Sequence, residues 1–127
     1  MITYDQARQV CLNKGGDLPT PRTPALLEEL KRYTKTFSRL VFIYIGFRND
    51  KYGTRSFRWR WAGDTYDAGA APFRFAPNPA SGNNRFRCVS MYRDLFTSHT
   101  CLNNREHRRI DIICDIGGEY LDLLAQH

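Results

Sequence analysis

The sequence predicts a single α+β domain: two helices, a mostly antiparallel sheet, a long loop region and two disulfides. Three observations favour this class. Helical patterns occupy the first third of the chain, the strand patterns that follow have no helix between them, and the four cysteines lie beside apolar residues. A length of 127 residues fits one domain, and an apolar content of 42% is sufficient for a core.

Both helices have recognisable ends. The first lies between Thr3, an N-cap with Gln6 at the capping-box position, and a stop at Gly15. The second begins at Thr23 and Pro24, an N-cap followed by proline at the first helical position, and is expected to end near Thr36. The apolar face predicted for this second helix consists of Leu26, Leu27, Leu30 and Tyr33.

Four later segments have strand patterns. Residues 40–47 form a short continuous apolar run, which is typical of a buried strand. In residues 56–61 aromatic residues alternate with serine and arginine, which predicts a strand with an aromatic face and a basic face. Residues 87–92 and 110–116 complete the set. Because no helix separates these strands, the pattern argues against parallel βαβ winding.

Two segments have no strand pattern. Residues 62–84 contain three prolines and end in Ser-Gly-Asn-Asn, so they are expected to form a long loop, and such loops are usually functional. Gly117 and Gly118 break the chain, and residues 119–127 are expected to form a last helical turn.

Cys11, Cys88, Cys101 and Cys114 contain no C-x-x-C pair, so neither a zinc knuckle nor a thioredoxin-type motif is indicated. Their even number favours two disulfides and hence an extracellular protein. Three pairings are open at this point, and four buried thiols in a cytosolic domain are the alternative. Because the start of the sequence has no signal-peptide pattern, disulfides would make it a mature or excised piece of a longer precursor.

The net charge is +6, and 15 of the 19 basic residues are arginine. The planar guanidinium suits carboxylate, sulfate and phosphate groups, which favours a surface for an anionic glycan, an acidic protein or nucleic acid. The alternative is a solvated surface in which the arginines pair with the 13 acidic residues. No apolar run approaches the roughly 18 residues of a membrane span. The arginines of interest are Arg55, Arg58, Arg60, Arg74, Arg85, Arg87, Arg105, Arg108 and Arg109.

The three histidines, His99, His107 and His127, raise the question of a metal or hydrolytic site. Their spacing fits no ligand motif, and no serine or free cysteine is placed as a nucleophile. Surface histidines in polar loops are the simpler interpretation. We therefore expect no enzyme activity, no catalytic residue and no cofactor.

These residues together resemble the C-type lectin-like domain family, from about residue 3 to residue 116. The matches keep the family's order and spacing, and no one of them decides alone. They are residues 4–18 (YDQARQVCLNKGGDL), 44–47 (YIGF at the W-I-G-L position), 59–63 (WRWAG), 78–80 (NPA at E-P-N), 88–89 (CV) and 113–115 (ICD).

The resemblance implies the pairs Cys11–Cys114 and Cys88–Cys101. It places the lectin-like domain in residues 1–116, followed by a linker or tail in residues 117–127. It also implies a first strand before Thr3, which is largely missing unless another segment supplies it.

Calcium-binding members of the family hold the ion with E-P-N, an acid before the second cysteine and W-N-D before the third. Here the corresponding residues are Asn78-Pro79-Ala80, Phe86 and Phe96-Thr97-Ser98, so every carboxylate is lost. The chain is thus identified as a divergent member without the calcium and sugar motif. A replacement calcium site is the weaker alternative, and its ligands would be Asn78, Asn83, Asn84 and Asp94.

The resemblance implies a non-catalytic extracellular recognition module that binds a protein or an anionic glycan without calcium. Nucleic acid is disfavoured, because the compartment is wrong and no binding motif is present. The alternatives are a structural domain of a larger extracellular assembly and a calcium-dependent lectin. The expected ligand-binding residues are Asn78, Asn83, Asn84, Arg85, Arg87 and Asp94.

Overall fold

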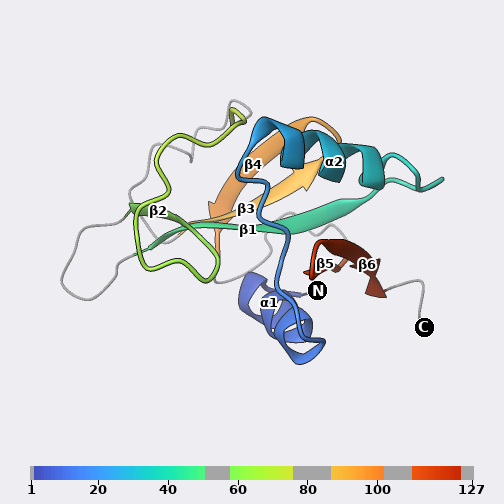
Figure 1. The fold of residues 1–127 in the computed structure, drawn as a ribbon, viewed down its shortest axis with the longest axis horizontal. Coiled ribbons are helices and arrows are strands. Elements are labelled where there is room, and N and C mark those ends of the chain that lie inside the picture. The colour runs from blue at the N-terminus through green and yellow to red at the C-terminus, as the bar shows by residue number, and fades with distance from the viewer. Residues whose placement is uncertain (1, 51–57, 76–86, 102–109, 124–127) are drawn as a thin grey trace.

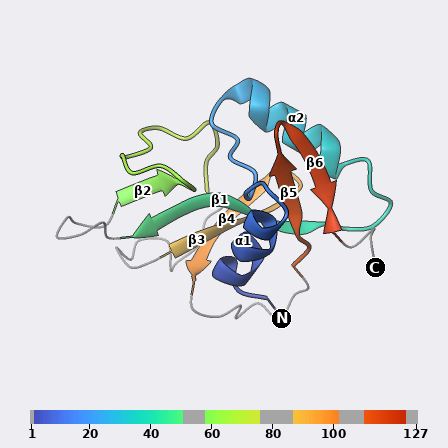
Figure 2. The same ribbon diagram turned by 60° about the horizontal axis from the view of Figure 1, so that its bottom comes forward.

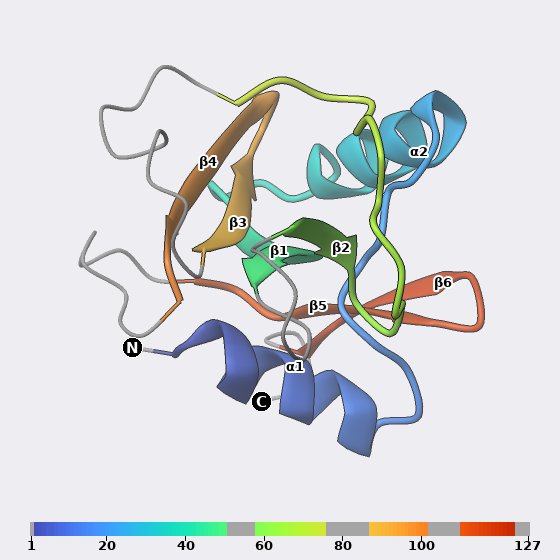
Figure 3. The ribbon, with the colours of Figure 1, turned by 90° about the vertical axis from the view of Figure 1, so that its left-hand side faces the viewer.

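A computed structural model describes residues 2–50, 58–75, 87–101 and 110–123. Helices α1 (Tyr4–Asn13) and α2 (Pro24–Thr34) precede all the strands and lie on opposite sides of a four-stranded sheet (Figures 1 and 3). The sheet is antiparallel, in the order β2-β1-β3-β4. Its strands are β1 (Phe42–Asp50), β2 (Arg58–Trp61), β3 (Arg87–Tyr92) and β4 (Leu95–Thr100).

A second, two-stranded sheet closes the molecule. It consists of β5 (Ile113–Ile116) and β6 (Glu119–Asp122), which pair antiparallel beside α1 (Figure 2). The two helices and the mostly antiparallel sheet confirm the α+β prediction.

The helix ends follow the predicted chemistry. At α1, Gln6 N–H donates to Thr3 Oγ1 at 3.2 Å and Thr3 N–H donates to Gln6 Oε1 at 2.9 Å, which completes the capping box. At α2, the Thr23 side chain accepts from the N–H of Leu26. The predicted apolar face of α2 is wrong in one position, since the Leu26 side chain is 39% exposed while Leu27 and Leu30 are buried and Tyr33 is partly buried.

Two strands were not predicted from the sequence. β4 follows β3 after only two residues, Arg93 and Asp94, which are not typical hairpin-turn residues. The expected last helical turn is wrong, because Glu119–Asp122 is the strand β6. Gly117 and Gly118 have φ of +62° and +93°, so they form the tight turn of a hairpin rather than a break in the chain.

The hairpin continues the fold past the domain boundary that was expected at residue 116. Cys114 pairs with Leu121 across the hairpin, and Leu123 is 7% exposed in the core cluster around α1. The first strand that the resemblance implied would lie before Thr3. In the described structure β5 has an antiparallel neighbour from the other direction along the chain, which is β6.

Each face of β1 is covered by a different core cluster. Ile43, Ile45 and Phe47 pack in the cluster with the buried leucines of α2, and Tyr44 packs in the cluster with α1. Aromatic rings extend the first cluster over the described part of the long loop. Within this aromatic group, the rings of Phe73 and Phe96 stack at 4.2 Å.

The structure contains both expected disulfides and no free cysteine, which excludes the alternative of four thiols. Cys11–Cys114 joins α1 to β5 across 103 residues of sequence, and Cys88–Cys101 joins β3 to the residue after β4 across 13. The long link therefore closes nearly the whole chain into a loop.

We predict that the two disulfides differ in their contribution to stability. Loop-closure entropy gives about 5 kcal/mol for the long link and about 3 kcal/mol for the short one. A Cys11→Ala, Cys114→Ala variant should therefore lose more unfolding free energy in urea than a Cys88→Ala, Cys101→Ala variant. An equal or reversed order would show that native packing around the bonds outweighs chain entropy.

We also predict that the hairpin belongs to the cooperative fold. Leu123→Ala should lower the free energy of unfolding by about 2–4 kcal/mol, because it leaves a cavity beside α1. Leu12→Ala is the matched control, since Leu12 is 42% exposed on α1, and its effect should stay within about 0.5 kcal/mol. Urea denaturation of both variants measures the difference. Equal effects would mean that residues past 116 form a tail.

Candidate functional site

The expected ligand-binding residues do not gather in one place within the described structure. Arg87 begins β3, whereas Asp94 lies in the turn beyond its other end. At about 3.3 Å per residue the strand holds them about 20 Å apart. The remaining four expected residues, Asn78, Asn83, Asn84 and Arg85, lie outside the described residues.

Arg87 is an interior side chain. It is 5% exposed, its Nε donates to Ser98 Oγ at 3.1 Å, and its Nη2 donates to the Ser98 carbonyl oxygen at 2.7 Å. Burial lowers the pKa of the guanidinium from its ordinary value, but an arginine stays charged at neutral pH. The structure therefore places a fixed positive charge inside the sheet, against β4.

This charge contacts one of the three residues that the resemblance places at the family's W-N-D position. Ser98 is the last residue of the three that correspond to W-N-D. Of the other two, Phe96 is buried against Phe73, and Thr97 Oγ1 lies 3.0 Å from Ser90 Oγ in a hydrogen bond. The described part of the site thus offers hydroxyl groups, an aromatic ring and a guanidinium. It does not fit a calcium ion, because a nearby cation raises the energy of a second one.

Asn49 adds one neutral oxygen at the same end of the sheet. It faces Arg87 across the β1–β3 ladder and is 8% exposed, and its Oδ1 accepts no hydrogen bond in the described structure. One amide oxygen beside a guanidinium is far from the six to eight oxygens that calcium takes. Within the described residues, no three His, Cys, Asp or Glu side chains are grouped to hold a metal ion.

The predicted basic face of β2 is only half present. Arg58 is exposed and its Nε lies 3.8 Å from Asp67 Oδ2, but Arg60 is 6% exposed and does not contribute to the surface. Asp64 pairs with Arg22, which the sequence analysis did not single out. Arg74 is exposed. The other arginines of interest, Arg55, Arg85, Arg105, Arg108 and Arg109, lie outside the described residues.

Asp94 belongs to a different surface. Its Oδ1 lies 3.6 Å from Lys31 Nζ and 3.7 Å from Lys35 Nζ, both on or just after α2. It therefore links the β3–β4 turn to the helix, and it cannot take part in a calcium site with the long loop without leaving these lysines.

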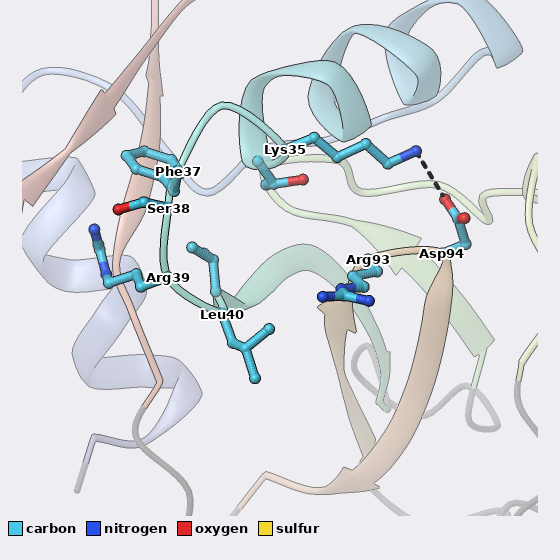
Figure 4. Close-up of a pocket in the computed structure, with 9 residues that line it drawn as sticks. Lys35, Phe37, Ser38, Arg39, Leu40, Arg93 and Asp94 are labelled. Atoms are coloured by element: carbon cyan, nitrogen blue, oxygen red, sulfur yellow. Dashed lines mark ion pairs between the residues drawn. The ribbon is translucent and has the colours of Figure 1, made fainter.

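A hollow that sequence reasoning missed adjoins Asp94. It has a volume of about 420 Å³ and lies between the segment that follows α2 and the β3–β4 turn (Figure 4). Charged and apolar side chains mix in its lining, to which Lys35, Phe37, Arg39, Leu40 and Arg93 contribute. No signal in the sequence joins residues 34–41 to residues 93 and 94, because their proximity comes from the packing of α2 on the sheet.

The fold, with its two helices, paired sheets and two disulfides, defines a C-type lectin-like domain. The family model for the lectin C-type domain matches residues 1–115, so the chain belongs to this family. Domains of this family are in general non-catalytic, and those with disulfides are typically extracellular or on the cell surface. In the described structure neither helix is long and apolar enough to cross a membrane.

We predict that Arg87 is required for stability as an arginine. Arg87→Lys keeps the charge but cannot donate to both Ser98 oxygens in the same geometry, so unfolding free energy should fall by about 1–3 kcal/mol. Arg58→Lys is the control, with an expected change within about 0.5 kcal/mol because Arg58 is exposed. Urea denaturation measures both. An Arg87→Lys variant with unchanged unfolding free energy would show that the two hydrogen bonds to Ser98 do not stabilise the fold.

Proposed function

We propose that this domain is a non-catalytic extracellular recognition module that binds a protein or an anionic glycan without calcium. The observation that carries the proposal is the buried guanidinium of Arg87 on Ser98. A module of this kind binds its ligand by surface complementarity and catalyses no reaction.

Electrostatics supports independence from calcium. The family's ion is held by carboxylates, and the matching positions here carry Ala80, Phe86 and Ser98. Arg85 flanks Phe86 in sequence, so positive charge accumulates where the ion would need negative charge. Removing anionic ligands and adding cations both lower the affinity of this site for calcium.

The same charges support an anionic ligand. The chain carries a net charge of +6, mostly through arginine, which binds carboxylate and sulfate groups in bidentate fashion. We place the contacts of the long loop at Asn78, Asn83, Asn84 and Arg85. Arg87 acts as a positioning residue rather than as a direct contact, since two of its donor groups are occupied by Ser98.

A glycan array read with calcium and again with a chelator tests the proposal. We expect the same pattern in both, either no signal or a signal confined to sulfated and sialylated glycans that weakens steeply with salt. Neutral-sugar binding that the chelator abolishes would restore a calcium-dependent lectin and overturn the proposal.

Thermal unfolding gives a control that does not depend on which glycans the array holds. A site that binds calcium at 1,000 times its Kd would add about 4 kcal/mol of stability. We expect the melting temperature to be the same with millimolar calcium and with chelator. A rise of several degrees with calcium alone would contradict the proposal.

A further inference from the structure

The hollow beside the β3–β4 turn has the size and the lining of a binding site. Its volume of about 420 Å³ lies in the range of ligand pockets, about 300–1,000 Å³. Its lining comes from two elements, residues 34–41 after α2 and residues 93 and 94 in the turn (Figure 4). It lies at the opposite end of β3 from Arg87.

Three cations and one carboxylate line the hollow, and their pairing is uneven. Asp94 is shared between Lys35 and Lys31. Arg39 Nη2 donates to Asp122 Oδ2 at 3.0 Å, so its charge is balanced from behind. Arg93 lies over the ring of Tyr92 and, within the described structure, pairs with no carboxylate. The hollow thus has one guanidinium left over for an incoming anion.

The backbone of Arg93 adopts an uncommon conformation at the turn. Arg93 has φ of +54°, and it is the one residue other than glycine in the described structure with a positive φ. The left-handed conformation is uncommon for arginine and favours glycine or asparagine. An asparagine at this position would suit the turn better, so the arginine can be replaced by asparagine without straining the turn.

Apolar side chains border the charges. Leu40, which lines the hollow, is 57% exposed, and Leu95, the residue after Asp94, is 53% exposed. Phe37 forms a further apolar wall, with the Arg39 guanidinium 4.9 Å from the centre of its ring. An exposed leucine and a phenylalanine in the same lining as the Arg93 guanidinium match a protein segment that carries one acidic and one apolar side chain.

We propose that this hollow is a docking site for a segment of a partner protein, in which an acidic side chain pairs with Arg93 and a neighbouring apolar side chain packs on Leu40. Because Arg39 is paired with Asp122 and Lys35 with Asp94, the charge of Arg93 is the one that favours an acidic residue over a neutral one. The inference rests on the proposed function in taking the domain to be a recognition module, and it gives that module a protein ligand at a second surface.

A phage-displayed library of random dodecapeptides tests the site, with selection on the wild-type domain and on Arg93→Asn. Asparagine removes the cation and suits the left-handed turn, so the variant should keep its fold. Arg32→Gln is the control with the same loss of charge, since Arg32 is exposed on α2 outside the hollow. We expect wild-type selections to enrich Asp or Glu beside Leu, Ile or Phe.

Enriched peptides are then synthesised and measured by fluorescence anisotropy. Arg93→Asn should weaken binding about tenfold and Leu40→Gln about fivefold, whereas Arg32→Gln should change it less than twofold. No enrichment, enriched peptides without acidic residues, or equal binding by Arg93→Asn would each overturn the site. Sulfated-glycan binding that is lost in Arg93→Asn, without peptide binding, would make the hollow a glycan site and also overturn the proposal.

The two proposals fail in different measurements. A calcium-dependent glycan signal would remove the proposed function while leaving a peptide result for Arg93 in place. Equal peptide binding by wild type and Arg93→Asn would remove only the docking site.

Discussion

The Cys11–Cys114 bond is the constraint on which the rest of the fold depends. It holds α1 against β5, and β5 in turn pairs with β6, so one covalent link fixes the helix and the closing hairpin together. Tyr4, Leu18 and Tyr44 pack in the cluster that contains this bond, which means that the α1 face of the main sheet is organised around it. The bond lies outside the β3–β4 hairpin, which has the long loop before β3 at one end and the two-residue turn at the other.

Local chemistry explains why the helices could be predicted, whereas the disulfide pairing was implied by the family resemblance. The caps at Thr3 and Thr23 act within three residues, so the sequence alone contains the whole interaction. The two missed strands depend on information that is not local. Arg93 adopts a left-handed backbone conformation that is uncommon for arginine, so the sequence did not predict the turn between β3 and β4. Tyr120, Leu123 and Leu124 have helical spacing, but pairing with β5 decides the conformation of the described residues 119–122.

The candidate site shows the same limit. The loss of the calcium carboxylates can be read from Ala80, Phe86 and Ser98, because family motifs are short and ordered. The burial of Arg87 could not be read in this way. It depends on the β3–β4 register, which brings Ser98 opposite Val89 and next to the guanidinium. Arg60 is also buried, at 6% exposed, although its spacing predicted a basic face.

Arg87 and Arg93 lie at the two ends of one hairpin, and the difference between their surroundings carries the functional argument. Arg87 is desolvated and its donors are used by Ser98, so its charge acts on its neighbourhood without being offered to a ligand. Arg93 is exposed at a turn, and the described carboxylate next to it in sequence is taken by two lysines. A guanidinium whose donors are occupied by neutral oxygens still repels a metal ion. A guanidinium without a carboxylate partner can bind an anion. The proposed independence from calcium and the proposed docking of an acidic partner thus rest on arginines at opposite ends of the same hairpin.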